Sequence, residues 1–163
     1  MQMQNKKGDT LFFKTPPSVL GYAAVGGKKE SEGPLADGFD VLNTDTTFGE
    51  KTWEQSESRM QAICAETALK KSGVTPKELD YLFAGDLENQ CTASNYTMRD
   101  LPVPFLGLYN ACATMAEGLG LAASFIAGGL AERTMALASS HFCAAERQYR
   151  FPLEYGGKRI LFP

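Results

Sequence analysis

The sequence predicts an α/β fold with a mostly parallel sheet covered by helices on both faces. Continuous apolar runs of strand length alternate along the chain with longer segments of helical periodicity. Strands that are buried on both faces are apolar throughout, as in parallel sheets, rather than alternating. With 163 residues, the chain is long enough for one domain with a hydrophobic core.

Composition excludes several classes of protein. The formal net charge is −3 and both signs are interspersed, so no basic stripe indicates nucleic-acid binding. The first eight residues lack the apolar stretch of a secretory signal. No two cysteines have CxxC spacing and His141 is the single histidine, which argues against zinc. We therefore expect an intracellular protein with reduced thiols, no metal and no cofactor.

The first part of the chain predicts one strand and one helix. Ser18–Val25 is typical of a buried strand, and two glycines follow it. Residues 28–50 are polar and glycine-rich, which favours a long loop without the spacing of an EF-hand. Trp53–Ser72 predicts a helix that Gly73 ends. Its expected core face consists of Met60, Ile63, Cys64, Thr67 and Ala68.

The second part predicts three further strands and one long helix. A helical turn at Thr75–Glu78 precedes the second strand, and the polar segment Leu87–Asp100 fits either a short helix or a loop. The other predicted elements are the strand Leu79–Ala84, the strand Pro102–Tyr109, the helix Ala113–Leu130 and the strand Thr134–Ser139. Residues 144–163 predict little regular structure.

The segment Ala111–Ala131 is nearly apolar over about the width of a membrane. Glu117 interrupts it, and its four glycines weaken it as an isolated helix. We therefore interpret this segment as a helix buried inside a soluble domain, whose small side chains let neighbouring backbones approach closely.

Cys112 stands between a predicted strand and this small-residue helix. The start of a helix has free backbone N–H groups and a partial positive charge, and both favour an anion. The position therefore suits either a nucleophilic thiolate or a pocket for a carboxylate. Because cysteine is also among the most buried residue types, a packing role stays open.

Several polar residues follow predicted strands. Asp86, Asn110, Cys112 and His141 each come after an apolar run. In parallel α/β sheets, ligands bind at the carboxyl ends of the strands. The four side chains are thus candidates for one crevice, although His141 also suits a structural histidine bonded to backbone.

Several short sequence motifs resemble those of a known family. Gly85-Asp-Leu-Glu-Asn-Gln90, Asn110-Ala-Cys112-Ala and Ala138-Ser-Ser-His141 resemble the amino-terminal half of the thiolase-like superfamily, with Cys112 at the position of its acyl-accepting cysteine. Within that superfamily the chain is similar to the stage V sporulation protein AD family. The further motifs that carry this similarity are Glu32-Gly-Pro-Leu35, Phe39-Asp40, Trp53-Glu54, Ala145-Glu-Arg-Gln148 and Tyr155-Gly-Gly157.

The resemblance implies a binding protein rather than a condensing enzyme. Members of the family bind dipicolinic acid (pyridine-2,6-dicarboxylate) and help to move it, with calcium, into the developing spore. They act with other proteins of the same sporulation operon, as peripheral proteins of the forespore inner membrane. The superfamily dimerises, so a homodimer is expected.

The resemblance covers residues 10–157 of one domain, and residues 158–163 look atypical of the family. The thiolase fold has two similar halves, so we expect this chain to be a truncated first half. The missing second half would leave apolar surface uncovered, which predicts dimerisation or aggregation.

Binding of dipicolinate calls for few groups. The helix start at Cys112 suits one carboxylate, and an arginine or asparagine suits the other. Asn110 and His141 are candidate pocket residues. Arg147 is a candidate partner for the second carboxylate, although it also suits a surface charge. Asp86 would repel a dianion unless it is protonated, faces calcium or orients a neighbouring donor, and we favour orientation. The alternatives are an acyl-transferring fragment that uses Cys112 and a ligand-free scaffold of a spore membrane complex.

Overall fold

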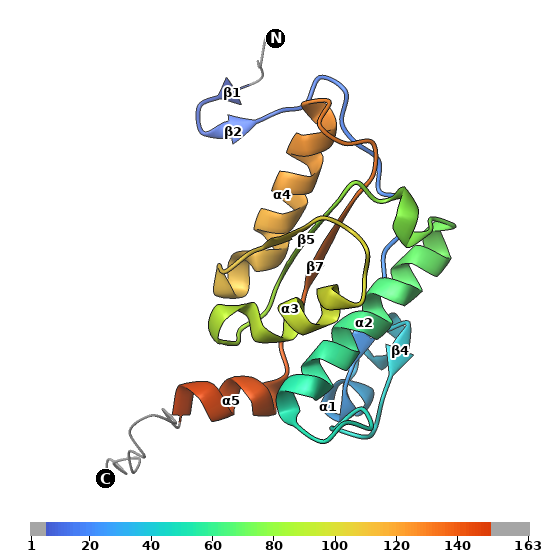
Figure 1. Ribbon diagram of the computed structural model, residues 1–163, viewed down its shortest axis with the longest axis vertical. Coiled ribbons are helices and arrows are strands. Elements are labelled where there is room, and N and C mark those ends of the chain that lie inside the picture. Colours follow the sequence, from blue (N-terminus) through green and yellow to red (C-terminus); the bar gives the residue numbers. More distant parts are fainter. Residues whose placement is uncertain (1–5, 151–163) are drawn as a thin grey trace.

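A three-stranded parallel sheet lies at the centre of the fold in the computed structural model, which describes residues 6–150 (Figure 1). Its strands are β5 (Tyr81–Gly85), β6 (Phe105–Gly107) and β7 (Thr134–Ala138), in the order β6-β5-β7. Both pairings are parallel, with Leu82 opposite Phe105 and opposite Met135. The parallel α/β architecture predicted from the sequence is confirmed.

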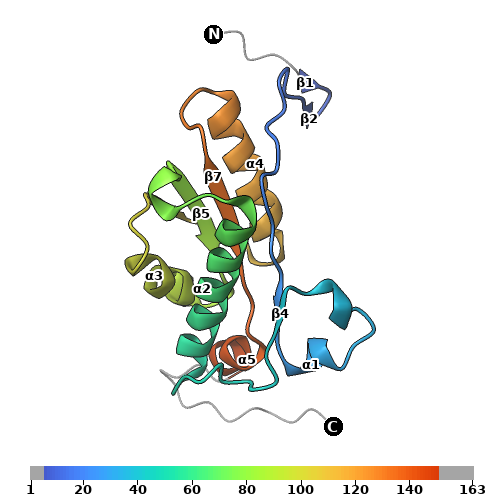
Figure 2. The same ribbon diagram turned by 90° about the vertical axis from the view of Figure 1, so that its right-hand side faces the viewer.

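Helices cover both faces of this sheet (Figure 2). Helix α4 (Thr114–Ala127) lies on one face, and α2 (Trp53–Ser72) and α3 (Thr92–Arg99) lie on the other. Alternate residues of β5 therefore enter different cores. Leu82 and Ala84 pack with residues of α2 and α3, whereas Phe83 packs with residues of α4. Burial on both faces explains why β5 is apolar at every position.

Small residues bring α4 close to the sheet. A Cβ atom on Gly118 would lie 3.3 Å from the Cβ atom of Ala136. Phe125 fills the space beside this contact, edge-on to Tyr81 and Phe83 at centroid distances of 5.1 and 4.9 Å. None of the helices in the described part of the chain combines the length and the apolar character needed to span a membrane.

The prediction that α4 is buried is wrong for one side of the helix. Met115 and Leu119 are 42% and 53% exposed, and Leu130 just after the helix is 64% exposed. A helix that is apolar all round needs neighbouring elements on both of its sides to be fully buried. The sheet covers only one side of α4.

Helix α2 has the predicted bounds. Its N-cap residue Thr52 accepts a hydrogen bond from the N–H of Gln55 at 3.2 Å, and Gly73 ends it at a φ of +68°. The predicted core face is only partly correct, because its residues are half-buried and Cys64 among them packs against the core. The buried residues are instead Ser56, Glu57, Gln61, Ala65 and Leu69. Hydrophobic periodicity misses this face because much of it is polar.

The predicted strand Ser18–Val25 is also wrong for most of its length. Only β3 (Val25–Gly26) is a strand, and it pairs in parallel with β4 (Val41–Leu42). The preceding residues are extended along α2, where a Cβ atom on Gly21 would lie 2.9 Å from that of Ser72. The large apolar side chains of this segment are exposed: Val19, Leu20 and Tyr22.

Other segments contain more regular structure than their sequence predicts. The expected loop 28–50 contains α1 (Lys28–Ser31), a 3-10 turn η1 (Ala36–Gly38) and β4. A short hairpin, β1 (Lys6–Lys7) with β2 (Thr10–Leu11), precedes it. Helix α5 (Phe142–Arg150) follows β7 where little structure was predicted. The remaining 3-10 turns are η2 (Pro76–Glu78), η3 (Asn89–Cys91) and η4 (Ala111–Ala113).

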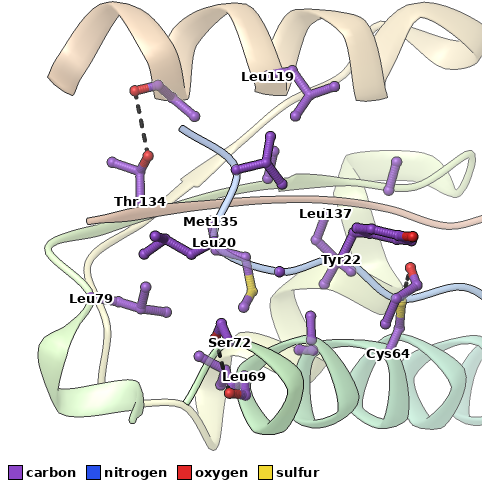
Figure 3. A pocket seen from close by; sticks show the side chains of 18 of the residues that line it. Leu20, Tyr22, Cys64, Leu69, Ser72, Leu79, Leu119, Thr134, Met135 and Leu137 are labelled. Carbon is purple, nitrogen blue, oxygen red and sulfur yellow. Dashed lines mark hydrogen bonds between the residues drawn. The ribbon is translucent and has the colours of Figure 1, made fainter. Parts of the chain in front are cut away.

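An apolar groove of about 1050 Å³ lies beside β7 (Figure 3). The extended segment that carries Leu20 and Tyr22 forms one wall, and α2, α4 and β7 form the others. This segment is not paired with β7, whose partner strand in the described sheet is β5. The predicted strand therefore passes beside the sheet without joining it.

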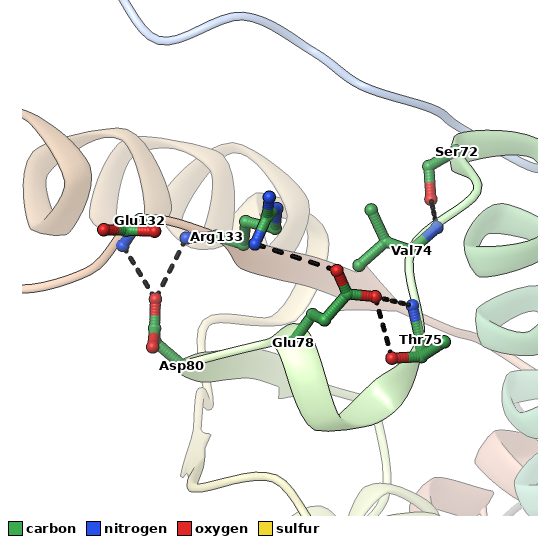
Figure 4. A network of polar contacts seen from close by, with 7 residues as sticks. All are labelled: Ser72, Val74, Thr75, Glu78, Asp80, Glu132 and Arg133. Atoms are coloured by element: carbon green, nitrogen blue, oxygen red, sulfur yellow. Dashed lines mark hydrogen bonds and ion pairs between the residues drawn. The ribbon is translucent and has the colours of Figure 1, made fainter.

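A polar network holds the amino ends of β5 and β7 in register (Figure 4). The carboxylate of Asp80 accepts the N–H groups of Glu132 and Arg133 at 2.7 and 3.0 Å. These backbone hydrogen bonds, that of Arg133 first, lower the pKa of Asp80. Nearby, Glu78 accepts the N–H of Thr75 at 2.9 Å and closes the turn η2.

Candidate functional site

The loops at the carboxyl edge of the sheet carry the residues that the sequence singled out. Asp86 directly follows β5, Asn110 and Cys112 follow β6, and His141 follows β7. The structure divides them into two groups. Asn110 and Cys112 are exposed, whereas Asp86 and His141 are buried at 1% and 8% exposure.

Cys112 lies in the middle of η4, which runs directly into α4. The N–H of Ala113 bonds to the carbonyl of Asn110 at 2.9 Å and turns the chain into the helix. Ala113 is the N-cap residue of α4 and makes no side-chain cap. The first amides of α4 therefore have no side-chain acceptor from their N-cap, which suits an anion from outside.

Backbone strain is concentrated in the loops after β5 and β6. Ala111 has a φ of +44°, and the consecutive residues Gln90 and Cys91 have φ values of +58° and +53°. Non-glycine residues in this region cost of order 1–3 kcal/mol each, and they cluster at functional sites. The Sγ of Cys91 donates to the carbonyl of Leu108 at 3.1 Å, which ties the two loops together. This strain independently marks the edge that carries Cys112.

Asp86 uses both of its oxygens inside the protein. One accepts the N–H of Glu88 at 2.8 Å, and the other accepts the N–H and the hydroxyl of Ser94 at 2.8 and 2.6 Å. Asp86 thereby holds the β5–α3 loop against the start of α3 and orients the Ser94 hydroxyl.

His141 lies on the other side of the edge and packs against α2. Its Nε2 is 2.8 Å from the carbonyl of Thr46, and its ring stacks on Trp53 at a centroid distance of 5.6 Å. Its Nδ1 is buried without a hydrogen-bond partner. Arg147 belongs to α5, but its side chain lies outside the described part of the structure, so its role stays a prediction.

Sequence reasoning missed a buried polar network beneath this edge. The amide nitrogen of Gln61 donates to the hydroxyls of Ser94 and Ser139 at 2.9 and 2.7 Å. Ser139 in turn donates to Glu57 at 2.6 Å. Burial raises the pKa of Glu57. The available signal was the spacing of four along α2, which places Glu57 and Gln61 in one row with the buried Ala65.

The edge combines a helix start that has no side-chain cap with a buried acidic network. Within residues 6–150, the acidic, histidine and cysteine side chains form no group of three that could hold a metal ion. The cysteines of the described chain, Cys64, Cys91, Cys112 and Cys143, are free thiols, and Cys112 is the exposed one.

Comparison with known proteins decides the family. The model of the stage V sporulation protein AD family (SpoVAD) matches residues 7–162. The stage V sporulation protein AD of Bacillus subtilis (strain 168) is 39% identical over 150 residues, which cover 92% of this chain. The chain belongs to the stage V sporulation protein AD family. It spans 44% of the length of that relative, as expected for an amino-terminal half.

Solved structures show that this member of the family has a thiolase-like fold. The Xanthomonas campestris OleA variant E117Q superposes with a TM-score of 0.59 at 18% identity, over 94% of this chain and 52% of that one. FabH of Xanthomonas oryzae, a 3-oxoacyl-(acyl carrier protein) synthase III, gives a TM-score of 0.54 at 20% identity, over 77% and 44% of the two chains. At this identity the likeness concerns the fold alone.

Proposed function

We propose that this member of the stage V sporulation protein AD family binds dipicolinic acid at the carboxyl edge of its sheet and supports the uptake of that acid, with calcium, into the developing spore. It would act with other proteins of the same operon, as a peripheral protein of the forespore inner membrane and as a homodimer. Family membership supports the sporulation role.

The start of α4 is the observation that carries the binding proposal. Amides without a side-chain cap and the positive end of the helix dipole suit one carboxylate of the ligand. The exposed Asn110 offers an amide donor beside them. Arg147 is the proposed partner of the second carboxylate, through a two-pronged contact of its guanidinium group.

Asp86 and His141 support the site from within rather than by direct contact. Every hydrogen bond of the Asp86 carboxylate goes to the β5–α3 loop or to Ser94. His141 is held between Trp53 and Thr46. We therefore propose that both fix the shape of the loops around the ligand.

The same geometry supports binding without catalysis. A condensation that uses a thiol needs acid–base groups beside the nucleophile. His141 is the single histidine of the sequence, and its Nε2 is engaged by Thr46. The second candidate function is acyl transfer to Cys112, which the exposure of that thiol at a helix start favours.

Calorimetric titration with dipicolinate tests the proposal. We expect saturable binding, and a loss of affinity of about tenfold, or ~1.4 kcal/mol, in Cys112→Ala. Cys64→Ala is the matched control, because this half-buried thiol lies on α2 in the apolar groove and should leave affinity unchanged. Benzene-1,3-dicarboxylate tests the ring nitrogen, and added calcium tests its part in binding.

Two other outcomes would overturn the proposal. Covalent labelling of Cys112 by an acyl thioester, seen as a mass shift, would favour acyl transfer. A folded sample that binds no dipicolinate with or without calcium would favour a ligand-free scaffold.

A further inference from the structure

Three carboxyl groups are buried together beneath the carboxyl edge. Glu57 comes from α2, and Asp86 and Glu88 come from the β5–α3 loop. Their exposed fractions are 0%, 1% and 0%. A buried charge is costly unless hydrogen-bond donors surround it. The donors available to each carboxyl group therefore decide whether it is ionised or protonated.

Donors are distributed unequally over these three groups. Asp86 receives three hydrogen bonds, two of them from backbone N–H groups. Glu57 receives the hydroxyl of Ser139 on one oxygen and the backbone N–H of His141 also supports it, but its Oε2 has no donor. Neither oxygen of Glu88 has one. Glu88 is thus a fully buried carboxyl group without a hydrogen-bond donor.

A proton on Glu88 removes this conflict. Glu57 and Glu88 each affect the pKa of the other through a side-chain hydrogen bond, so the two buried carboxyl groups are neighbours. Two carboxylates are both acceptors and cannot bond, whereas a neutral carboxylic acid donates to a carboxylate. Two neighbouring negative charges repel each other, which also opposes the ionisation of both groups at once.

We propose that Glu57 and Glu88 form a buried carboxyl pair that shares one proton, and that this proton fastens the β5–α3 loop to α2. The same loop contains the strained residues Gln90 and Cys91. Loss of the proton would place a second negative charge on the pair, beside Asp86, and would loosen the loop at the edge of the sheet.

The charges around the pair act in the same direction. The pKa of Glu88 is raised to about 8, mainly by burial and to a smaller extent by the negative charges of Glu57, Asp86 and Glu54. The other titratable groups at this network are His141, beside Glu57, and Cys91, whose pKa burial raises. A carboxyl group with a raised pKa in the folded state stabilises the fold most at low pH. That stability falls as the pH rises from about 4.5 to about 8.

Infrared spectroscopy in D₂O tests for the shared proton. We expect the C=O band of a neutral carboxylic acid in the folded wild-type chain at pH 7, and its disappearance in Glu88→Gln. Glu66→Gln is the matched control, because Glu66 lies on α2 and is exposed. Absence of the band from the wild type would overturn the proposal, whether or not any variant folds.

Urea unfolding as a function of pH tests the fastening of the loop. As the pH rises from about 4.5 to about 8, the folding constant of the wild type should fall by up to tenfold per pH unit, which is the linkage of one proton. In Glu88→Gln the amide is a permanent donor to Glu57, so this dependence should disappear while Glu66→Gln keeps it. In the wild type, we also expect amide hydrogen exchange at residues 86–91 to be faster at pH 9 than at pH 6. The increase should exceed the intrinsic effect of pH on amide exchange. An unchanged pH dependence in Glu88→Gln would overturn the proposal.

Discussion

At the scale of single residues, Glu117 lies close to the proposed anion site at the start of α4. It lies in the first turn of α4, where a carboxylate interacts favourably with the positive end of the helix. Its side chain is half-buried, and its Oε2 has no hydrogen-bond partner. A bound dianion would therefore compete with Glu117 for the same end of the helix dipole.

Neutralising this residue should strengthen binding. We expect Glu117→Gln to bind dipicolinate about two- to fivefold more tightly, since one charge at a helix end is worth ~0.3–1 kcal/mol. Titration calorimetry at low salt measures the effect, with the exposed Glu132→Gln as the control. Weaker binding by Glu117→Gln would instead show that the carboxylate positions the ligand.

Residue types alone did not reveal the role of the buried polar side chains. Asp86 and His141 were recognised because they follow apolar strands, which is a local signal. Glu57 and Glu88 carry no such signal, since a glutamate is usually exposed and only its neighbours in space can bury it. Their state depends on Ser139, which is 82 positions from Glu57 along the chain.

At the scale of elements, the end of β5 is closely packed against its neighbours at Gly85. A Cβ atom on Gly85 would clash with the carbonyl of Leu108 and would lie 2.7 Å from Cγ2 of Thr114. These neighbours belong to the loop after β6 and to the start of α4. Glycine at this position therefore sets how closely the strand approaches the helix start at the candidate site.

Substitution of this glycine should destabilise the fold and disturb the site together. We expect Gly85→Ala to lower the free energy of unfolding by about 1–3 kcal/mol, the usual cost of overpacking. It should also weaken dipicolinate binding, because Leu108 and Thr114 flank the η4 turn. Urea unfolding measures the first effect. Gly120→Ala is the control, because a Cβ atom on Gly120 would meet no neighbour within 4 Å. Equal stability of the two variants would contradict the expected clash.

At the scale of the whole molecule, α4 leaves an apolar surface uncovered. The side of α4 that lines the apolar groove presents the exposed Met115 and Leu119, and the exposed Leu130 follows the helix. The relative from Bacillus subtilis is more than twice as long as the matched segment, and the chain covers 52% of the OleA structure. In the isolated chain, this surface is available for self-association.

We expect the chain to form dimers or larger species through this surface. Leu119→Glu should shift the population toward monomer, because a charge there would be desolvated on association. Sedimentation velocity at several concentrations measures the shift. Ser124→Glu is the control on the same helix, since Ser124 is exposed and polar. A wild-type chain that stays monomeric throughout would contradict the expectation.

Elements with strong local signals were predictable. Thr52 and Gly73 bound α2 through cap chemistry that is written in the neighbouring residues. Strands β5 and β7 were predictable because parallel strands are buried on both faces and hence apolar throughout. From the order of these elements, the sequence predicts that Asp86, Asn110, Cys112 and His141 each follow a strand.

Elements whose state depends on distant partners were not predictable. Ser18–Val25 has the composition of a buried strand, yet it packs on α2 beside the groove instead of pairing with β7. Helix α4 has the composition of a core helix, yet Met115 and Leu119 on its groove-lining side are exposed. Composition reports a preference for burial, whereas burial itself needs a neighbour.

The sequence by itself determined the family, the parallel α/β order and the position of Cys112 at the start of a helix, because local patterns carry each of them. Only the tertiary structure decided which side chains are buried together. The packing of α2 against the β5–α3 loop removed Glu57, Asp86 and Glu88 from water. Desolvation depends on every surrounding element at once, so no local pattern contains it.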